Sequence, residues 1–238
     1  MKNGFGQDSN AFAILAGVTG TNHTSSQVLN TLKKLSTSSG PLAFSNGTIA
    51  SGFQKLISPY ASAYHLRAAF SVGDGEVAKD LLKTLWKPMA DPSGINYTGC
   101  FWETLSADGG LGLGPITSLC HAWGSGPTGE LSMYVLGVQA IKPGYAEWQV
   151  SPLTMGLEWA RGNVPVPGGE IAVSWNATDD VITRIEVLSP AQTRGIIKLP
   201  ASSNCSWGWN LNGKPVNGAN GTFVVNGGEK VLLTLNVA

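Results

Sequence analysis

The chain has 238 residues, enough for one large or two small domains. Charged residues make up 13% of it, about half of the roughly 25% typical of soluble domains, and the formal net charge is zero. No basic patch indicates a nucleic-acid partner, no acidic tail indicates a solvating role, and no apolar run is long enough to predict a membrane span.

The first part of the chain has the periodicity of helices joined by short loops. Apolar residues recur at i, i+3, i+4 and i+7, and Ser/Thr clusters or a Ser-Pro pair stand where helices would begin. This alternation is typical of stacked helical hairpins, and about six helices would form half of a closed double ring of twelve. The expected helices are 11–18, 28–35, 60–70, 76–87 (ended by Pro88), 115–122 and a last one from Thr128 to Gly137.

The second part reads as short strands rich in β-branched residues and separated by Gly, Pro and Asn turn signals. Ile171, Val173 and Trp175 alternate with polar neighbours, as one buried face of a strand requires. We therefore predict an antiparallel β-sandwich over 139–238 after a helical domain over 1–138. Trp175 and Trp159 are both expected in its core rather than on a sugar-binding surface. The expected strands are 148–150, 157–161, 170–175, 181–187, 195–199, 223–225 and 230–235.

One carboxylate stands among large rings in a chain where charge is scarce. Glu103 directly follows Trp102, and a glycine-rich segment leads from there to His121 and Trp123. A ring beside a carboxylate excludes water and offers a flat face to a sugar, which is typical of a glycoside-cleaving site. The alternatives are a loop carboxylate paired with a backbone N–H or a lysine, and a buried histidine with satisfied hydrogen bonds.

Two further aromatic residues, Tyr60 and Tyr64, stand one helical turn apart and either line a pocket or simply pack. The chain has three histidines and no Cys/His spacing that fits a metal site, so we expect neither a metal nor a cofactor. The glycine-rich run at 109–114 lacks the preceding strand and the spacing of a nucleotide-binding loop.

Cysteines and glycosylation sequons bear on the compartment. Cys100 and Cys120 could form a disulfide or be two small buried residues, and both interpretations stay open. Six Asn-X-Ser/Thr sequons favour a secreted eukaryotic glycoprotein. Because no signal peptide begins at Met1, we expect the chain to be an internal piece of a longer protein. The sequons are at Asn22, Asn46, Asn96, Asn176, Asn204 and Asn220.

Five short segments carry a resemblance to a known family: 7–10 (QDSN), 100–103 (CFWE), 118–123 (SLCHAW), 137–144 (GVQAIKPG) and 156–169 (GLEWARGNVPVPGG). In this order and spacing they resemble the C-terminal half of the inverting α-L-rhamnosidases of glycoside hydrolase family 78, of the fungal secreted kind. The resemblance covers nearly the whole chain. It implies an α+β multidomain fold, here a partial (α/α)6 six-hairpin barrel followed by a C-terminal antiparallel β-sandwich.

The resemblance also implies roles for residues of the central stretch. Glu103 would be the general base that activates the attacking water, and Trp102 would line the rhamnose site. His121 would hydrogen-bond a sugar hydroxyl, with Trp123 beside it.

An inverting mechanism needs a second carboxyl group as general acid. In the family it lies in an acid-rich motif on the first half of the barrel, which neither Asp8 nor Asp108 matches. The expected partners are therefore a rhamnose-containing glycoside and the missing N-terminal half of the barrel.

We thus expect an inverting glycoside hydrolase that releases terminal α-L-rhamnose from plant glycosides or polysaccharides, with this chain supplying the general-base half of the site. The alternative is a non-catalytic carbohydrate-binding remnant that lacks the general acid. A purely structural role would predict no affinity for sugar at all.

Overall fold

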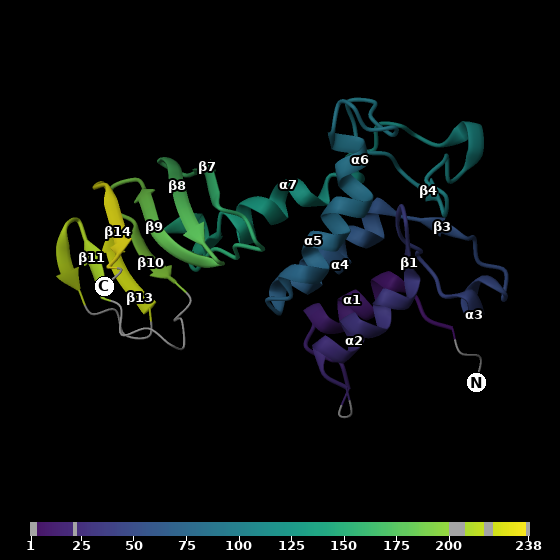
Figure 1. Cartoon of the computed structure of the whole chain (residues 1–238), viewed down its shortest axis with the longest axis horizontal. Coiled ribbons are helices and arrows are strands. Elements are labelled where there is room, and N and C mark those ends of the chain that lie inside the picture. Colours follow the sequence, from purple (N-terminus) through teal and green to yellow (C-terminus); the bar gives the residue numbers. More distant parts are fainter. Residues whose placement is uncertain (1–3, 21–22, 200–207, 217–220, 237–238) are drawn as a thin grey trace. The chain divides into compact units, whose positions relative to one another are not determined.

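The computed structural model describes residues 4–20, 23–199, 208–216 and 221–236. It divides into two compact units, Met1–Glu130, which is mostly helical, and Leu131–Ala238, which is mostly β-sheet (Figure 1). The first sheet strand of the second unit starts at Val138. Within the described ranges, no helix combines the length and the apolar character that crossing a membrane would require.

A central helix, α4, organises the first unit. It packs against α1, α5 and α7, and it buries Leu66, Ala68 and Ala69 completely. Two short antiparallel pairs, β1–β2 and β3–β4, complete the unit. The helices are α1 (Gln7–Leu15), α2 (Ser25–Leu32), α3 (Asn46–Ile49), α4 (Pro59–Ser71), α5 (Gly75–Leu81), α6 (Lys87–Ala90) and α7 (Gly126–Glu130), and the strands are β1 (Ser36–Thr37), β2 (Gly40–Pro41), β3 (Leu56–Ile57) and β4 (Leu105–Ser106).

Local capping chemistry explains where several helices begin. Thr24 accepts a hydrogen bond from the Gln27 backbone, and the Gln27 side chain accepts one from the Thr24 N–H, which forms a capping box. Ser58 caps α4 with Pro59 at the first helical position, and Asp74 caps α5. The helix starts expected at the Ser/Thr cluster and at the Ser-Pro pair are confirmed.

The expectation that Pro88 ends a helix is wrong. The chain continues from α5 through a π-helical turn, Leu82–Trp86, into α6, and Pro88 lies in the first turn of α6. In the π turn the Lys87 N–H donates to the Leu82 carbonyl, five residues back. Because first-turn positions need no intrahelical N–H donor, proline is tolerated there.

The expected helix over 115–122 is also wrong. Only single 3₁₀ turns form, at Gly114–Ile116 and at Ala122–Gly124. Between them, the Ser118 carbonyl accepts a hydrogen bond from the Glu103 N–H instead of from a backbone N–H of its own segment. The last expected helix begins at Gly126 rather than Thr128 and continues beyond α7 as a π-helical turn at Leu131–Val135.

The second unit is a β-sandwich-like pair of sheets. Among the described strands, one sheet has the order β13-β10-β6-β5 and the other β12-β11-β14-β9-β8-β7. Pairing is antiparallel apart from β6 with β10, which is parallel, so the expectation of a purely antiparallel sandwich needs that correction. The strands are β5 (Val138–Ala140), β6 (Glu147–Val150), β7 (Trp159–Val166), β8 (Gly169–Thr178), β9 (Val181–Leu188), β10 (Arg194–Lys198), β11 (Trp209–Leu211), β12 (Lys214–Val216), β13 (Thr222–Asn226) and β14 (Val231–Leu235).

The buried face expected on β8 is confirmed. Ile171, Val173 and Trp175 are at most 2% exposed, and the Trp175 indole donates a hydrogen bond to the Val135 carbonyl at 3.0 Å. Trp159 differs from the expectation, because it is 65% exposed and lies outside the core. Trp159 shares its side of β7 with Arg161 and Asn163, and this polar side of the strand is the exposed one.

A buried histidine on α4 is expected to make the stability of the fold depend on pH. His65 is 3% exposed, and Gln7 Nε2 donates to its Nδ1 at 3.2 Å. Burial lowers the pKa of His65 from 6.5 to about 4 and outweighs the attraction of the Asp74 carboxylate. Between these pH values the unfolded chain binds the extra proton. The contribution of His65 to the free energy of unfolding is therefore fully present above pH 6.5. It should fall by about 3 kcal/mol as the pH drops to 4.

Urea unfolding of the wild type and of His65→Gln between pH 4 and 7 measures this contribution. The variant removes the titrating group, so its free energy of unfolding should fall less steeply with decreasing pH. Equal slopes in the two proteins would show that His65 does not titrate in this way.

Candidate functional site

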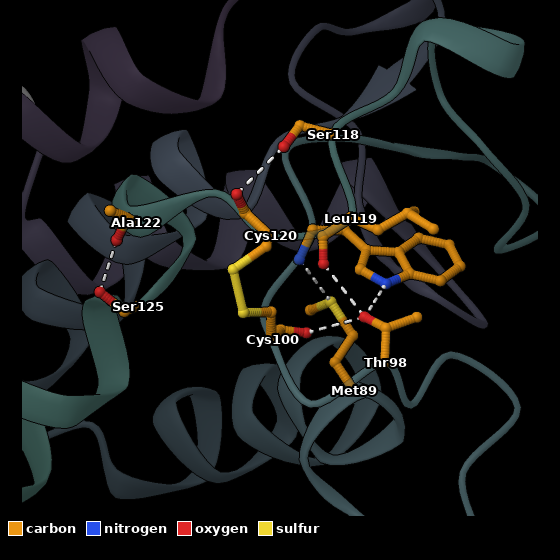
Figure 2. Close-up of a disulfide and its surroundings, with 9 residues drawn as sticks. Met89, Thr98, Cys100, Ser118, Leu119, Cys120, Ala122 and Ser125 are labelled. Atoms are coloured by element: carbon orange, nitrogen blue, oxygen red, sulfur yellow. Dashed lines mark hydrogen bonds between the residues drawn. A yellow bond between two sulfur atoms is a disulfide. The ribbon is translucent and has the colours of Figure 1, made fainter.

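A disulfide joins the two segments on either side of the glycine-rich loop. Cys100 and Cys120 form a disulfide (Figure 2). Of the two possibilities that the sequence left open, a disulfide or two small buried residues, the structure contains the disulfide. Thr98 Oγ1 donates to the Leu119 carbonyl at 3.0 Å, which adds a second link between the segments (Figure 2). The spacing between the two candidate segments is therefore covalently fixed.

Backbone hydrogen bonds continue this pairing toward the candidate base. The His121 N–H donates to the Phe101 carbonyl at 2.8 Å, and the Glu103 N–H donates to the Ser118 carbonyl at 2.9 Å. Glu103 is half-buried, and its Oε2 accepts from the Ser118 N–H at 3.2 Å. The structure thus contains the backbone partner considered for Glu103. Among the described residues it records no hydrogen bond or ion pair to Oε1.

Five rings from separate parts of the first unit lie in contact along its surface; we call them the aromatic row. Phe12, Tyr60 and Trp123 are exposed, and Tyr64 and His121 are half-buried. The ring centroids are 4.4 Å apart for Phe12 and Tyr64, 5.2 Å for Tyr64 and Tyr60, 5.7 Å for Tyr60 and Trp123, and 5.4 Å for Trp123 and His121. Trp123 is 68% exposed and Tyr60 45%. The two tyrosines therefore pack on each other, and Tyr60 keeps a surface that a ligand can reach.

Close backbone packing holds Trp123 in this row. A Cβ added at Gly124 would lie 2.9 Å from the Trp102 carbonyl oxygen and 3.1 Å from the Phe101 Cβ, so a larger residue would force the backbone apart here. The Trp86 indole donates to the Gly124 carbonyl at 2.8 Å. The 3₁₀ turn that carries Trp123 is thereby fixed against the start of α4, next to the tyrosines of that helix.

The structure does not bring Trp102 to the aromatic row. Its indole is 7% exposed and donates to Thr98 Oγ1 at 3.0 Å, and it lines a cavity of about 570 Å³ together with Asp108. Phe101 and His121 line a different cavity, of about 400 Å³. Successive residues of an extended chain point to opposite sides, which separates these two neighbours. Sugar contact by Trp102 stays a prediction.

The sequence analysis identified every member of the aromatic row except Phe12 as a candidate site residue. The apolar stripe of α1 places Ala11 and Ile14 in the core, and both are at most 6% exposed. Phe12 lies off that stripe and is 46% exposed. A large aromatic residue on the polar side of an amphipathic helix was the signal that could have identified it.

The sequons fall in different environments. Asn46, on α3, and Asn176, on β8, are exposed. Asn96 is 8% exposed, and its Nδ2, the atom that would carry a glycan, donates to the Gly109 carbonyl at 2.9 Å. The remaining sequons, at Asn22, Asn204 and Asn220, lie outside the described residues.

The chemistry available in the first unit is that of neutral ligand binding with one carboxylate at hand. Aromatic faces pack against the C–H faces of a sugar ring, and tyrosine hydroxyls and the imidazole of His121 hydrogen-bond its hydroxyls. Glu103 Oε1 can accept a proton from water. In the part of the chain that the structure covers, His, Cys, Asp and Glu form no group of three or more that could hold a metal ion.

Comparisons with known proteins point to one enzyme family. Residues 137–208 match the family model "Bacterial alpha-L-rhamnosidase C-terminal domain". An α-L-rhamnosidase of Alteromonas sp. (strain LOR) is 33% identical over 93 residues, which make up 37% of this chain and 10% of that protein.

Two solved structures share the fold. The α-L-rhamnosidase of Dictyoglumus thermophilum superposes on 98% of this chain with a TM-score of 0.72 and 15% identity, and the match takes up 26% of that structure. A GH78 family rhamnosidase of Bacillus sp. GL1 covers 83% of this chain with a TM-score of 0.62 and 24% identity, over 19% of its own length. At these identities the likeness concerns the fold alone.

These matches are to glycosidases, and the chain spans only about a tenth to a quarter of their lengths. The chain is therefore similar to part of the α-L-rhamnosidases: to their C-terminal domain in sequence, over residues 137–208, and to their fold over nearly its whole length.

Proposed function

We propose that this chain supplies the general-base part of the sugar site of an inverting α-L-rhamnosidase, which releases terminal α-L-rhamnose from plant glycosides or polysaccharides. The observation that carries the proposal is the contact of His121 and Trp123 with the rest of the aromatic row, because both residues follow Cys120 on the disulfide-linked segment pair that also holds Glu103. The match of residues 137–208 to the rhamnosidase C-terminal domain supports rhamnose as the sugar.

In this mechanism the rhamnose ring lies against Trp123 and Tyr60, and His121 hydrogen-bonds one of its hydroxyls. Glu103 takes a proton from a water molecule, and the oxygen of that water attacks the anomeric carbon from the side opposite the leaving group. A second carboxyl group protonates the leaving oxygen. The two carboxyl groups must be about 6.5–9.5 Å apart for the water to fit between them.

The second carboxyl group would come from a part of the enzyme outside this sequence. The chain matches about a quarter of the Dictyoglumus thermophilum structure, so about three quarters of that relative have no counterpart in this sequence. We propose that α1, α2, α4 and α5 form helical hairpins of a partial (α/α)6 six-hairpin barrel. An N-terminal half of the barrel would complete the ring and supply the general acid.

We also propose that the intact enzyme is a secreted glycoprotein of the fungal kind. The disulfide favours an oxidising compartment, and the sequons at Asn46 and Asn176 are exposed. Mass spectrometry of peptides from the protein isolated from its source tests this, and unmodified peptides at both positions would contradict it.

A second candidate function rests on the openness of the same surface. Trp123 is 68% exposed, whereas a glycosidase site encloses its sugar to exclude water. By itself the chain would then bind sugar as a non-catalytic carbohydrate-binding unit. Release of the aryl group from an aryl α-L-rhamnoside by the full-length enzyme separates the two functions. It should depend on Glu103 if this chain supplies the base, and Glu103→Gln should leave it unchanged if this chain only binds sugar.

Titration of the chain with L-rhamnose tests the role of the aromatic row. Trp123→Ala should weaken binding by about tenfold, because it removes the largest exposed ring of the row. Phe53→Ala is the matched control, since that ring is 53% exposed in the same unit but lies outside the aromatic row, and its affinity should equal that of the wild type. Unchanged rhamnose affinity in Trp123→Ala would contradict the proposed site.

A further inference from the structure

The outer face of the six-stranded sheet carries a polar surface that the proposed function does not use. Every second residue of β7 is exposed on this face, among them Trp159, Arg161 and Asn163. On the neighbouring strand β8, the side chains of the other face are buried. In the strand register Arg161 is the partner of Ser174 on β8, and Ser174 is the partner of Glu186 on β9. These strands are neighbours in the sheet (Figure 1), so the side chains form a continuous row across it.

This row is hollowed into a groove of about 320 Å³. Its walls include Arg161, Asn163, Ser174, Glu186 and Lys230, with apolar atoms from the strands beneath. A groove that combines a few polar groups with apolar surface is typical of small-ligand sites.

An exposed indole that is not part of the groove's lining precedes it on the same side of β7. Trp159 is 65% exposed and stands two residues before Arg161 on the same side of β7, about 6.8 Å along the strand. A single exposed apolar residue is ordinary on a protein surface. An indole in line with a polar groove is different, because it extends that groove by a flat face on which a ring can stack.

The charges in the groove are not balanced. Lys230 Nζ lies 2.8 Å from Glu186 Oε1, and Arg184 lies 3.0 Å from Glu186 Oε2, so both oxygens of that carboxylate are engaged. The hydrogen bond from Lys230 lowers the pKa of Glu186 and keeps it ionised. Asn163 Nδ2 is engaged by Glu170 at 2.9 Å. For the Arg161 guanidinium, the structure records no ion pair among the residues it describes, which leaves a positive charge free for a ligand.

We propose that this groove binds an oligosaccharide that contains uronic acid, with a sugar ring stacked on Trp159 and the uronate carboxylate paired with Arg161. A planar guanidinium matches a carboxylate through two parallel hydrogen bonds, and an indole packs on the C–H face of a sugar. The site goes beyond the proposed hydrolysis of rhamnosides, because it lies in the other unit and takes an acidic ligand. It would hold an acidic polysaccharide while the sugar site acts on it.

Isothermal titration of the 238-residue chain with a galacturonic acid trimer tests the proposal. A glycan on Asn176, the register partner of Trp159 on the neighbouring strand, would lie beside this indole. The proposal therefore applies to the chain unmodified at Asn176, and the protein is produced in a bacterial host without N-glycans. The neutral control ligand is the same trimer with its carboxyl groups reduced to alcohols. Near-UV circular dichroism checks that each variant keeps the fold.

Trp159→Ala and Arg161→Gln should each weaken trimer binding by about tenfold, and Arg161→Gln should also abolish the preference for the acid over its neutral counterpart. Arg194→Gln, which removes an exposed arginine of β10 in the other sheet, should bind the trimer as the wild type does. No binding by the wild type, equal affinity for the neutral trimer, or insensitivity to both groove variants would overturn the proposal. A failure of rhamnose binding at Trp123 would leave this result unaffected.

Discussion

Replacing Glu103 with glutamine in the full-length enzyme is expected to lower kcat for α-L-rhamnoside hydrolysis by on the order of 10²-fold or more. Glutamine keeps the size of the side chain and an oxygen that can accept from the Ser118 N–H, so the segment pair stays intact. The amide cannot take a proton from water. The loss should therefore fall on kcat, while substrate affinity and the free energy of unfolding change little.

Glu76→Gln is the matched control for this variant. Glu76 is an exposed carboxylate on α5 that forms an i,i+3 ion pair with Lys79. Its replacement should leave turnover unchanged. Proton NMR of the first sugar released by the wild type adds an independent check, because single displacement yields the inverted β-anomer. Near-normal turnover by Glu103→Gln would end the assignment of Glu103 as the base.

Removing the disulfide is the change with the second largest expected effect. In the double variant Cys100→Ser/Cys120→Ser, the loop between positions 20 residues apart is no longer closed in the unfolded chain. The free energy of unfolding should fall by about 3 kcal/mol. Turnover of the intact enzyme should also fall, on the order of tenfold or more, because the segments that carry Glu103 and His121 lose their fixed spacing.

Chemical denaturation with and without a reducing agent measures the stability effect. The reductant should destabilise the wild type and leave the double variant unchanged, since the variant has no bond between these positions to reduce. If the variant unfolds at the same denaturant concentration as the oxidised wild type, the bond does not stabilise the fold. If turnover is retained as well, the bond does not position the site.

Features set by neighbours in the chain could be predicted from the sequence. Thr24 and Ser58 cap helices because each side chain accepts from the backbone N–H three residues ahead, which is a local matter. The alternation at Ile171, Val173 and Trp175 likewise predicted a buried strand face.

Features set by tertiary contacts could not be predicted. The π turn that carries the helix past Pro88 includes Trp86, which is 2% exposed and donates to the Gly124 carbonyl, 38 positions along the chain. The aromatic row combines Phe12 of α1 with residues of α4 and of the turn after Cys120, and no periodicity connects these positions. The exposure of Trp159 depends on which face of the sheet other elements cover.

The structure of the full-length Glu103→Gln variant with an intact α-L-rhamnoside tests the central claim most directly. The account predicts the rhamnose ring against Trp123 and Tyr60, a hydroxyl bonded to His121, and a water between residue 103 and the anomeric carbon. Rhamnose bound elsewhere, for example in the cavity lined by Trp102 and Asp108, or an anomeric carbon beyond the reach of a water held by residue 103, would contradict it.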